Sequence, residues 1–449
     1  MNALEEPRTQ AGQADVESAS TDHADATCSC CEPTLARVEA RPWLDAGRRL
    51  TVDQAWAQLQ RVHGERAPGR PYCVYVHIPF CASICAFCAL YTKAVNASAD
   101  TVFDGFVDAL VRGIRGHPAA GCRRPPTTVH FGGGTPLHIG MSRLAKLVQA
   151  LRDAFGNAAT CEWAIEITTA SVDAHTLDEL WRLGFRRVHL GVQTLDERIR
   201  QANRIAGRAD DVVARVAAVA EHGFLTSVDL ITGFEGEQGG SLCADALRLH
   251  AVGSKMFSVC ELRHRKPAAL PGTNKSRQIL AALALEGWLE FWDLMHALGL
   301  QPIHHGQFGR SQADNLYYTH PARGEDCVAI GPYANGSAAS VWYANLLLPD
   351  YIAAVQARRP PIAQARDFGA QFQLLKHVER ELLAHELQAS TCAAAVAQHP
   401  WLQDCISEWQ ALGLLRWHVV PQAHTLTATG SWYVGNMIMQ MRARAEGSA

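Results

Sequence analysis

Three cysteines lie close together in the sequence at a spacing suited to metal chemistry. Cys81, Cys85 and Cys88 form a C-x3-C-x2-C run. A cubane 4Fe-4S cluster has four iron corners, so three thiolates leave one iron open to a small molecule. A zinc site is the alternative, although zinc sites usually combine paired C-x2-C units and no second pair follows here. The spacing therefore favours a cluster with one open iron.

The sequence around this run predicts the elements that position it. From residue 72 onward, short apolar runs alternate with amphipathic stretches, which is typical of βα units that build a parallel sheet. We expect six strands, over residues 73–78, 127–131, 164–168, 187–191, 227–231 and 256–261. The cysteine run follows the first strand, at the carboxyl end of the sheet, where α/β barrels carry their active groups.

A glycine-rich turn follows the second expected strand. Gly132, Gly133, Gly134 and Thr135 lie at the same end of the sheet as the cysteine run. Glycine permits close backbone approach to a ligand, whose amino and carboxylate groups can bond the amides and carbonyls there. A glycine triplet alone is also typical of a simple turn. Its place beside the cysteine run favours a ligand site.

Four motifs, in their order along the chain, resemble one known family. They are Tyr75-Val-His-Ile-Pro-Phe-Cys81, His130-Phe-Gly132-Gly-Gly-Thr-Pro136, Gly191-Val-Gln193-Thr-Leu-Asp196 and Val228-Asp229-Leu-Ile-Thr-Gly233. Together they are similar to the oxygen-independent coproporphyrinogen III oxidase-like (HemN-like) branch of the radical SAM enzymes. The resemblance covers residues 72–256 well and continues more weakly through 324–345 and 426–432.

The resemblance implies a fold, two cofactors and a set of binding residues. The fold is α/β, a partial (β/α)6 radical SAM barrel with a smaller α+β C-terminal domain. Cys81, Cys85 and Cys88 would hold a 4Fe-4S cluster, at which one or two molecules of S-adenosylmethionine (SAM) bind and one is cleaved by a single electron. The residues expected to contact SAM are Tyr75, Phe87, Gly132, Gly133, Gly134, Thr135, Glu166, Gln193, Arg204 and Asp229.

Strand periodicity supports a ligand role for the two carboxylates. Glu166 alternates with Ile165 and Ile167, so its side chain points to the opposite face, which is the barrel lumen. An inward carboxylate needs a partner. That partner is either SAM, through its ammonium for Glu166 or a ribose hydroxyl for Asp229, or a salt bridge within the barrel. Arg204 is expected to bond the methionyl carboxylate or the ribose.

The sequence departs from coproporphyrinogen oxidases at two motifs. Those enzymes carry Cys-Gly-Cys where Cys88 is followed here by Ala89 and Leu90, and their Glu-x-Asn-Pro reads Glu166-Ile-Thr-Thr169. Class C radical SAM methyltransferases share the present cysteine loop. We therefore expect methylation of an sp2 carbon in a planar conjugated substrate, namely a tetrapyrrole, quinone or heteroaromatic. The alternatives are decarboxylation of the coproporphyrinogen oxidase type and a haem-binding carrier.

Three further segments are candidates for ligand contact. The basic residues 263–266 would bind substrate carboxylates such as propionates, unless they are a solvated charge run. The loop 331–336 loosely matches the segment near a second SAM in the methyltransferases. Four aromatic residues either line the pocket of a flat substrate or pack in the core, namely Tyr317, Tyr318, Trp342 and Tyr343.

Length and composition predict three regions. The 449 residues, of which 48% are hydrophobic, are sufficient for two folded units. Residues 1–42 are expected to be a disordered tail, in which Cys28, Cys30 and Cys31 are either unstructured thiols or ligands of a metal or auxiliary cluster. Residues 43–271 would form the barrel with an N-terminal extension, and residues 272–449 the C-terminal α+β domain.

Charge and hydropathy exclude several classes of partner. A net charge of -3 gives no general attraction to nucleic acid or to an anionic membrane. No apolar run approaches the roughly 20 residues that cross a bilayer, and the start of the sequence has no secretory pattern. We expect a cytoplasmic monomer that acts on a small molecule and takes electrons from a donor such as flavodoxin or ferredoxin.

Overall fold

The computed structural model describes most of the chain beyond residue 46. It covers residues 47–64, 71–88, 90–121, 125–156, 158–262, 274–322 and 325–447. All of them belong to the compact unit Ala36–Ala449. The expected tail with Cys28, Cys30 and Cys31 lies outside the described residues, as does the basic segment 263–266. Within the described part, every helix is too short or too polar to cross a membrane.

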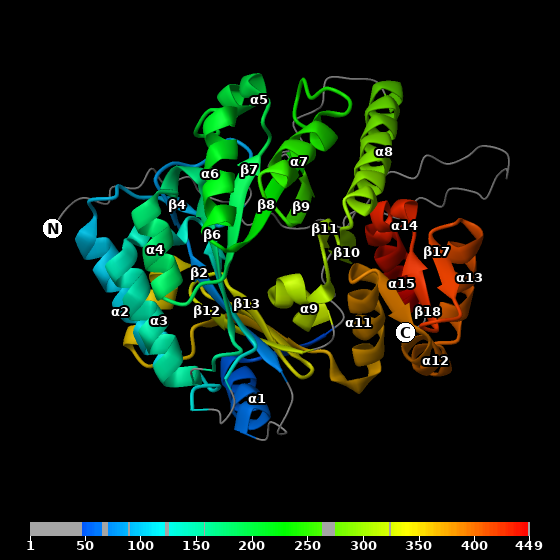
Figure 1. Ribbon diagram of the computed structural model, residues 1–449. Helices are drawn as coiled ribbons and strands as arrows, with labels where there is room; N and C mark the ends of the chain where they lie inside the picture. The colour runs from blue at the N-terminus through cyan, green and yellow to red at the C-terminus, as the bar shows by residue number, and fades with distance from the viewer. Residues whose placement is uncertain are drawn as a thin grey trace. The chain divides into compact units, whose positions relative to one another are not determined.

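Parallel strands form the centre of a sheet that has thirteen strands among the described residues (Figure 1). In sheet order the parallel strands are β12 (Asp326–Ile330), β2 (Tyr72–Ile78), β5 (Thr128–Gly133), β6 (Glu162–Thr168), β7 (Arg187–Gln193), β8 (Leu225–Thr232) and β9 (Met256–Glu261). The strands from β2 to β9 are the six expected from the sequence, with bounds that differ by at most two residues. The sequence did not predict β12, which pairs with β2.

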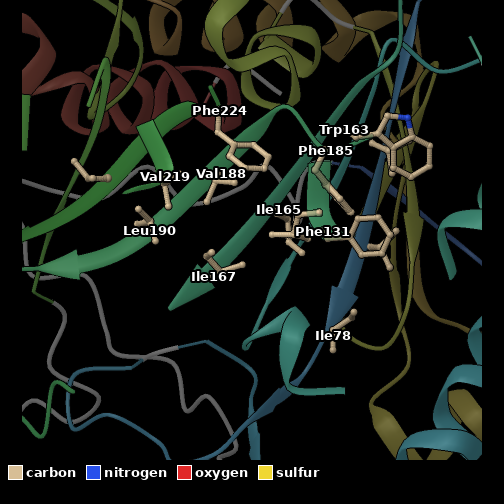
Figure 2. Close-up of a cluster of buried hydrophobic side chains, with 14 of the residues drawn as sticks. Ile78, Phe131, Trp163, Ile165, Ile167, Phe185, Val188, Leu190, Val219 and Phe224 are labelled. Carbon is tan, nitrogen blue, oxygen red and sulfur yellow. The ribbon is translucent and has the colours of Figure 1, made fainter. Parts of the chain in front are cut away.

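Helices that follow the parallel strands cover one face of the sheet (Figure 1). They are α2 (Asp100–Gly116), α3 (Met141–Phe155), α4 (Ala174–Arg182), α5 (Glu197–Ala202), α6 (Ala209–Glu221) and α7 (Ser241–Ala251). Alternate strand residues such as Phe131, Ile165 and Val188 point toward these helices and are fully buried in the main core (Figure 2). The polar residues between them point to the other face, which we call the inner face.

Antiparallel strands extend the sheet at both edges. Beside β12 lie β13 (Asn335–Ala338), β14 (Val341–Asn345), β15 (Ile362–Asp367) and β1 (Arg48–Leu50). Beside β9 lie β11 (Gln307–Gly309) and β10 (Gln301–His304). The residues after 272 thus add strands next to both β2 and β9, so the division into domains at that position stays a proposal.

The last part of the chain has its own hydrophobic core and a small sheet. Its elements are α11 (Gly369–Leu383), β16 (Glu386–Gln388), α12 (Ala389–Gln398), α13 (Trp401–Ala411), β17 (Leu415–His418), β18 (Ala423–Leu426), α14 (Ala428–Trp432) and α15 (Val434–Gly447). Leu375, Leu402 and Met437 belong to this second core. The mixture of helices and antiparallel strands confirms the expected α+β character.

One short helix lies against the inner face of the sheet. This helix, α9 (Leu316–Ala322), contacts β2, β5 and β12 on one side and α11 on another (Figure 1). The other elements are α1 (Val52–Gly64), β3 (Phe80–Cys81), β4 (Lys93–Ala94), α8 (Asn274–Ala297), α10 (Leu348–Gln356) and the short 3-10 helices Pro136–Ile139, Thr169–Ser171 and Gln312–Asn315. The site that the sequence predicts lies where the parallel strands end.

Candidate active site

The cysteine loop begins directly after β2 and continues from the two-residue strand β3. All three thiols are free and half-buried. The Cys81 Sγ atom lies 3.5 Å from Thr135 Oγ1, and the Cys88 amide donates to the Cys85 carbonyl over 3.2 Å. The first contact joins the loop to the glycine turn, as the sequence predicted for these two motifs.

The three thiols influence one another electrostatically. Burial raises the pKa of Cys81 and Cys85, and Cys88 adds a repulsive charge to both. Within the described ranges, no three His, Cys, Asp or Glu side chains are grouped tightly enough to hold a single metal ion. A cubane binds each thiolate at a different iron and so needs no such convergence on one ion.

The glycine turn is packed by the protein's own atoms. Its amides donate to strand-end carbonyls, from Gly134 to Ile78 over 2.8 Å and from Thr135 to Phe80 over 2.7 Å. A Cβ atom at Gly132 would lie 2.5 Å from Glu166 Oε1, and one at Gly134 would lie 2.6 Å from the Phe80 carbonyl oxygen. Both distances are shorter than van der Waals contact. The Phe80 backbone therefore requires glycine at Gly134, whether or not a ligand approaches, whereas a Cβ atom at Gly132 would displace the end of the Glu166 side chain.

Replacing Gly134 by alanine is expected to destabilise the fold. The added methyl would push against the backbone of Phe80 and disturb the bond from Thr135, which we expect to lower the free energy of unfolding by about 1–3 kcal/mol. Gly105 on the exposed face of α2 is the matched control, because a Cβ there meets nothing within 4 Å. Gly105→Ala should raise stability by about 0.5–1 kcal/mol. Chemical denaturation of both variants tests the contrast, and equal effects would contradict it.

Glu166 occupies the centre of the inner face at the carboxyl ends of the strands. Its carboxylate accepts from His130 Nε2 at 2.8 Å and from the Gly133 amide at 3.3 Å, yet 30% of the side chain stays accessible. Burial raises the pKa of Glu166, and the charge of Asp229 raises it further. A cation placed beside Glu166 and Asp229 would offset the repulsion between the two carboxylates. The accessible surface leaves room for such contact.

A polar network on the inner face contacts Glu166 through His130. The Arg187 guanidinium is fully buried, donates to Glu162 at 3.0 Å, and contacts His189. It also lies 3.5 Å from His130 Nδ1. Burial, reinforced by the charge of Arg187, lowers the pKa of His130 well below its usual value, so this imidazole is neutral. Its Nδ1 then accepts from Arg187 while its Nε2 donates to the Glu166 carboxyl group.

Sequence reasoning did not identify this network. His130 stands two residues before Gly132 on β5, while Arg187 and His189 alternate with buried Val188 on β7. Strand alternation alone would have placed all three side chains on the inner face. Asp229 also points to this face, where its Oδ1 lies 3.9 Å from His189 Nδ1 and 35% of its side chain is accessible. The structure therefore brings Asp229 and Glu166 to one surface.

Gln193 and Arg204 both adopt the left-handed backbone conformation that is uncommon for residues other than glycine. Their φ angles are 70° and 56°. Such backbone strain is often found at functional sites. Buried Arg200 holds both segments, because its guanidinium donates to carbonyls of residues 192, 194, 206 and 207. The carbonyl of Asn203 accepts from the amide of Ala86, so this turn also contacts the cysteine loop, 3.4 Å away.

Two aromatic residues complete the predicted set. Tyr75 on β2 bonds His77 Nδ1 through its hydroxyl at 3.1 Å, and its ring stacks on Tyr317 with 5.1 Å between centroids. Phe87, between two cysteines, packs edge-on against Phe234, which follows β8. The structure thus places Tyr75 on the inner face and Phe87 beside the end of β8.

The arrangement fits a cluster and a charged, amphoteric ligand. The loop with the three half-buried thiols meets the glycine turn through Cys81, and two partly accessible carboxylates lie on the adjoining inner face. Arg204 supplies an exposed cation on the turn that contacts the cysteine loop. Thiolates suit iron, carboxylates suit an ammonium, and a guanidinium suits a carboxylate. The donor set therefore matches a cubane and an amino acid derivative bound to it.

Comparison with known proteins defines the class. Residues 75–244 match the model of the Radical SAM superfamily. The solved structure of coproporphyrinogen III oxidase (HemN) from Escherichia coli, a radical SAM enzyme, aligns with a TM-score of 0.72 at 21% identity and covers 90% of this chain and 99% of its own. At that identity the likeness shows the fold. Residues 75–244 of the chain therefore carry a radical SAM domain, and this family uses a 4Fe-4S cluster and SAM.

The sequence relatives of the chain include HemN-like proteins. Anaerobilin synthase from Escherichia coli O157:H7 is 25% identical over 406 residues, which are 86% of this chain and 87% of that protein. Oxygen-independent coproporphyrinogen III oxidase from Escherichia coli K12 is 30% identical over 203 residues, which are 44% and 43% of the two chains. The match to this oxidase thus spans less than half of its length, whereas the match to the synthase spans nearly all of both chains.

Proposed function

We propose that this radical SAM enzyme methylates an sp2 carbon of a planar conjugated substrate, with a tetrapyrrole as the first candidate. The relative that matches along nearly the whole chain is named for a bilin, and the partial relatives are named for a porphyrinogen. Both compounds are tetrapyrroles. Neither name states methyl transfer. The proposal of methyl transfer rests on the cysteine loop. Here Cys88 is followed by Ala89 and Leu90, and the extra cysteine of the oxidases is missing.

One observation carries the proposal of SAM cleavage. The loop of Cys81, Cys85 and Cys88 is tied to the glycine turn at Thr135, beside the accessible Glu166 carboxylate. When bound, the cluster and SAM supply a one-electron reductive cleavage that generates a 5'-deoxyadenosyl radical. A low-potential donor such as flavodoxin or ferredoxin would provide the electron.

The chain's own residues would bind and orient SAM. Glu166, held by His130, would accept from the ammonium, and Arg204 would bond the methionyl carboxylate or the ribose. Asp229 would accept from a ribose hydroxyl. Phe87 would shield the loop from water or stack near the adenine. Tyr75 and the turn from Gly132 to Thr135 would contact SAM on one side. Gln193, the last residue of β7, would contact it as well.

The products of an anaerobic reaction test the proposed chemistry. Reconstituted protein is incubated with SAM, dithionite and either haem or coproporphyrinogen III. Methylation by one SAM and radical formation from another predict both 5'-deoxyadenosine and S-adenosylhomocysteine, with a mass gain of one methyl group in the tetrapyrrole. Decarboxylation predicts 5'-deoxyadenosine and loss of carbon dioxide without S-adenosylhomocysteine. A carrier, as suggested by a haem chaperone HemW from Synechocystis at 31% identity over 197 residues, would form neither nucleoside product.

Binding of SAM is expected to weaken as the pH falls. Burial and the charge of Asp229 raise the pKa of Glu166, while His189 and His77 nearby lower it in part, and His130 stays neutral. Only the ionised carboxylate attracts the ammonium, so acidification through this raised pKa removes the attraction. The dissociation constant for SAM should therefore increase as the pH is lowered from about 8 to about 5. Affinity that improves on acidification would contradict this role of Glu166.

A further inference from the structure

A cavity of about 790 Å³ lies between the antiparallel edge of the sheet and α11. β13 and β14 form one wall, α11 forms another, and α9 closes a third side. The volume is within the range of roughly 300–1,000 Å³ that is typical of small-molecule sites. Its lining includes Asn335 and Gly336 of the loop 331–336, but no residue from the cysteine loop, the glycine turn or the set expected to contact the cluster-bound SAM. The cavity is therefore distinct from the site at the cysteine loop.

Aromatic side chains give the cavity flat apolar surfaces. Tyr317 and Tyr318 come from α9, Trp342 from β14, and Phe368 precedes α11. Tyr343, also considered from the sequence, is instead buried in the core, where its hydroxyl accepts from the Ala329 amide at 3.0 Å. Rings that line a cavity of this size favour a planar conjugated ligand, because such a ligand can stack on them.

Positive charge is concentrated on the α11 wall. Lys376, His377 and Arg380 line the cavity, whereas no Asp or Glu is among its described lining residues. The Lys376 side chain is only 18% exposed, and its Nζ lies 4.7 Å from the centre of the Phe368 ring. A carboxylate oxygen of Glu379 lies 3.9 Å from Nζ, at the outer limit of an ion pair. Burial lowers the pKa of Lys376, and an incoming carboxylate would offset that penalty.

The cavity shares one wall with the candidate active site. Tyr317 lines the cavity and stacks on both His130, at 4.4 Å between centroids, and Tyr75, at 5.1 Å. His130 in turn donates to Glu166. A ligand in the cavity would therefore be separated from the Glu166 network by the ring of Tyr317 and the helix that carries it.

We infer that this cavity is a second ligand site, which binds a planar conjugated anion by stacking on its aromatic walls and by pairing carboxylates with Lys376 and Arg380 of α11. The inference goes beyond the proposed function and does not depend on it. Carboxylates suit this wall because Arg and Lys bond them with charge-assisted hydrogen bonds. The aromatic lining distinguishes the site from a simple anion site that inorganic phosphate could fill.

The test measures the binding of protoporphyrin IX to the reconstituted full chain. Quenching of tryptophan fluorescence gives the dissociation constant for the dicarboxylate, for its neutral dimethyl ester and for inorganic phosphate as competitor. The ester should bind about tenfold to a hundredfold more weakly, because it cannot pair with the basic wall. Phosphate should displace little porphyrin. The double variant Lys376→Gln, Arg380→Gln should lose the preference for the dicarboxylate.

A matched variant and a second readout separate the possible outcomes. Lys146→Gln removes an exposed lysine on α3, far from the cavity lining, and should leave porphyrin affinity unchanged. Thermal melting checks that the double variant is folded, and the ester comparison needs no variant at all. Equal affinity for acid and ester, or unchanged affinity in the folded double variant, would overturn the inference. Formation of 5'-deoxyadenosine is assayed on the same samples, so failure of SAM cleavage would refute only the proposed function.

Discussion

Replacing Cys85 by serine should abolish both the cluster and the formation of 5'-deoxyadenosine. A cubane with one open iron depends on all three protein thiolates, and a serine hydroxyl is a much poorer ligand for iron. The half-buried loop offers Cys81 and Cys88 as the other two ligands. Iron and sulfide content, together with product formation from SAM, measure the effect in protein purified without oxygen.

A second cysteine variant controls for the loss of any thiol. Cys243 is half-buried on α7 and packs at the edge of the main core, outside the cysteine loop. Cys243→Ser should retain full iron content and product formation. If the Cys85 variant also retained both, the loop would not be the cluster site.

Replacing Glu166 by glutamine should lower the affinity for SAM about tenfold to a hundredfold. The amide keeps the shape of the side chain, but its single oxygen can accept from only one of the two donors, His130 Nε2 and the Gly133 amide, that now contact separate carboxylate oxygens. It loses the charge, and a hydrogen bond between charged groups is worth about 1.5–3 kcal/mol. Isothermal titration of SAM into reconstituted protein measures the change, while iron content should stay constant.

The control for Glu166 is a carboxylate outside the site. Glu221 ends α6 and is exposed, so Glu221→Gln should bind SAM like the unaltered protein. Loss of iron together with SAM affinity in the Glu166 variant would point to a disturbed fold. Unchanged SAM affinity would remove Glu166 from the binding site. The pH dependence described above should also be weaker in this variant.

The parallel sheet could be predicted from the sequence because each strand is a local pattern. β-branched and aromatic residues in β2, β5, β6, β7, β8 and β9 form short runs between amphipathic helices. β12 could not be assigned in the same way. Its partner β2 lies far away in the sequence, and only tertiary pairing, such as Cys327 with Cys73, shows that the two strands are parallel neighbours. Strand pairing at long range leaves no local signal.

The sequence could indicate which residues form the candidate site, but it could not indicate most of the contacts between them. The motifs identified the cysteines, the glycine turn and Glu166, and the structure places them where the parallel strands end. The structural need for glycine at Gly134 was not foreseen, because it comes from the Phe80 backbone in another segment, and the contact of Gly132 with Glu166 likewise depends on a neighbouring strand. The stacking of Tyr317 on His130 likewise depends on how α9 meets the inner face, which no periodicity encodes.

Mössbauer spectroscopy of the reconstituted full chain, recorded with and without SAM, tests the central claim most directly. The account predicts the spectrum of a 4Fe-4S cluster in which one iron site alone changes when SAM is added, because three irons are held by Cys81, Cys85 and Cys88. Absence of such a cluster, or a spectrum in which SAM alters no individual iron site, would contradict it.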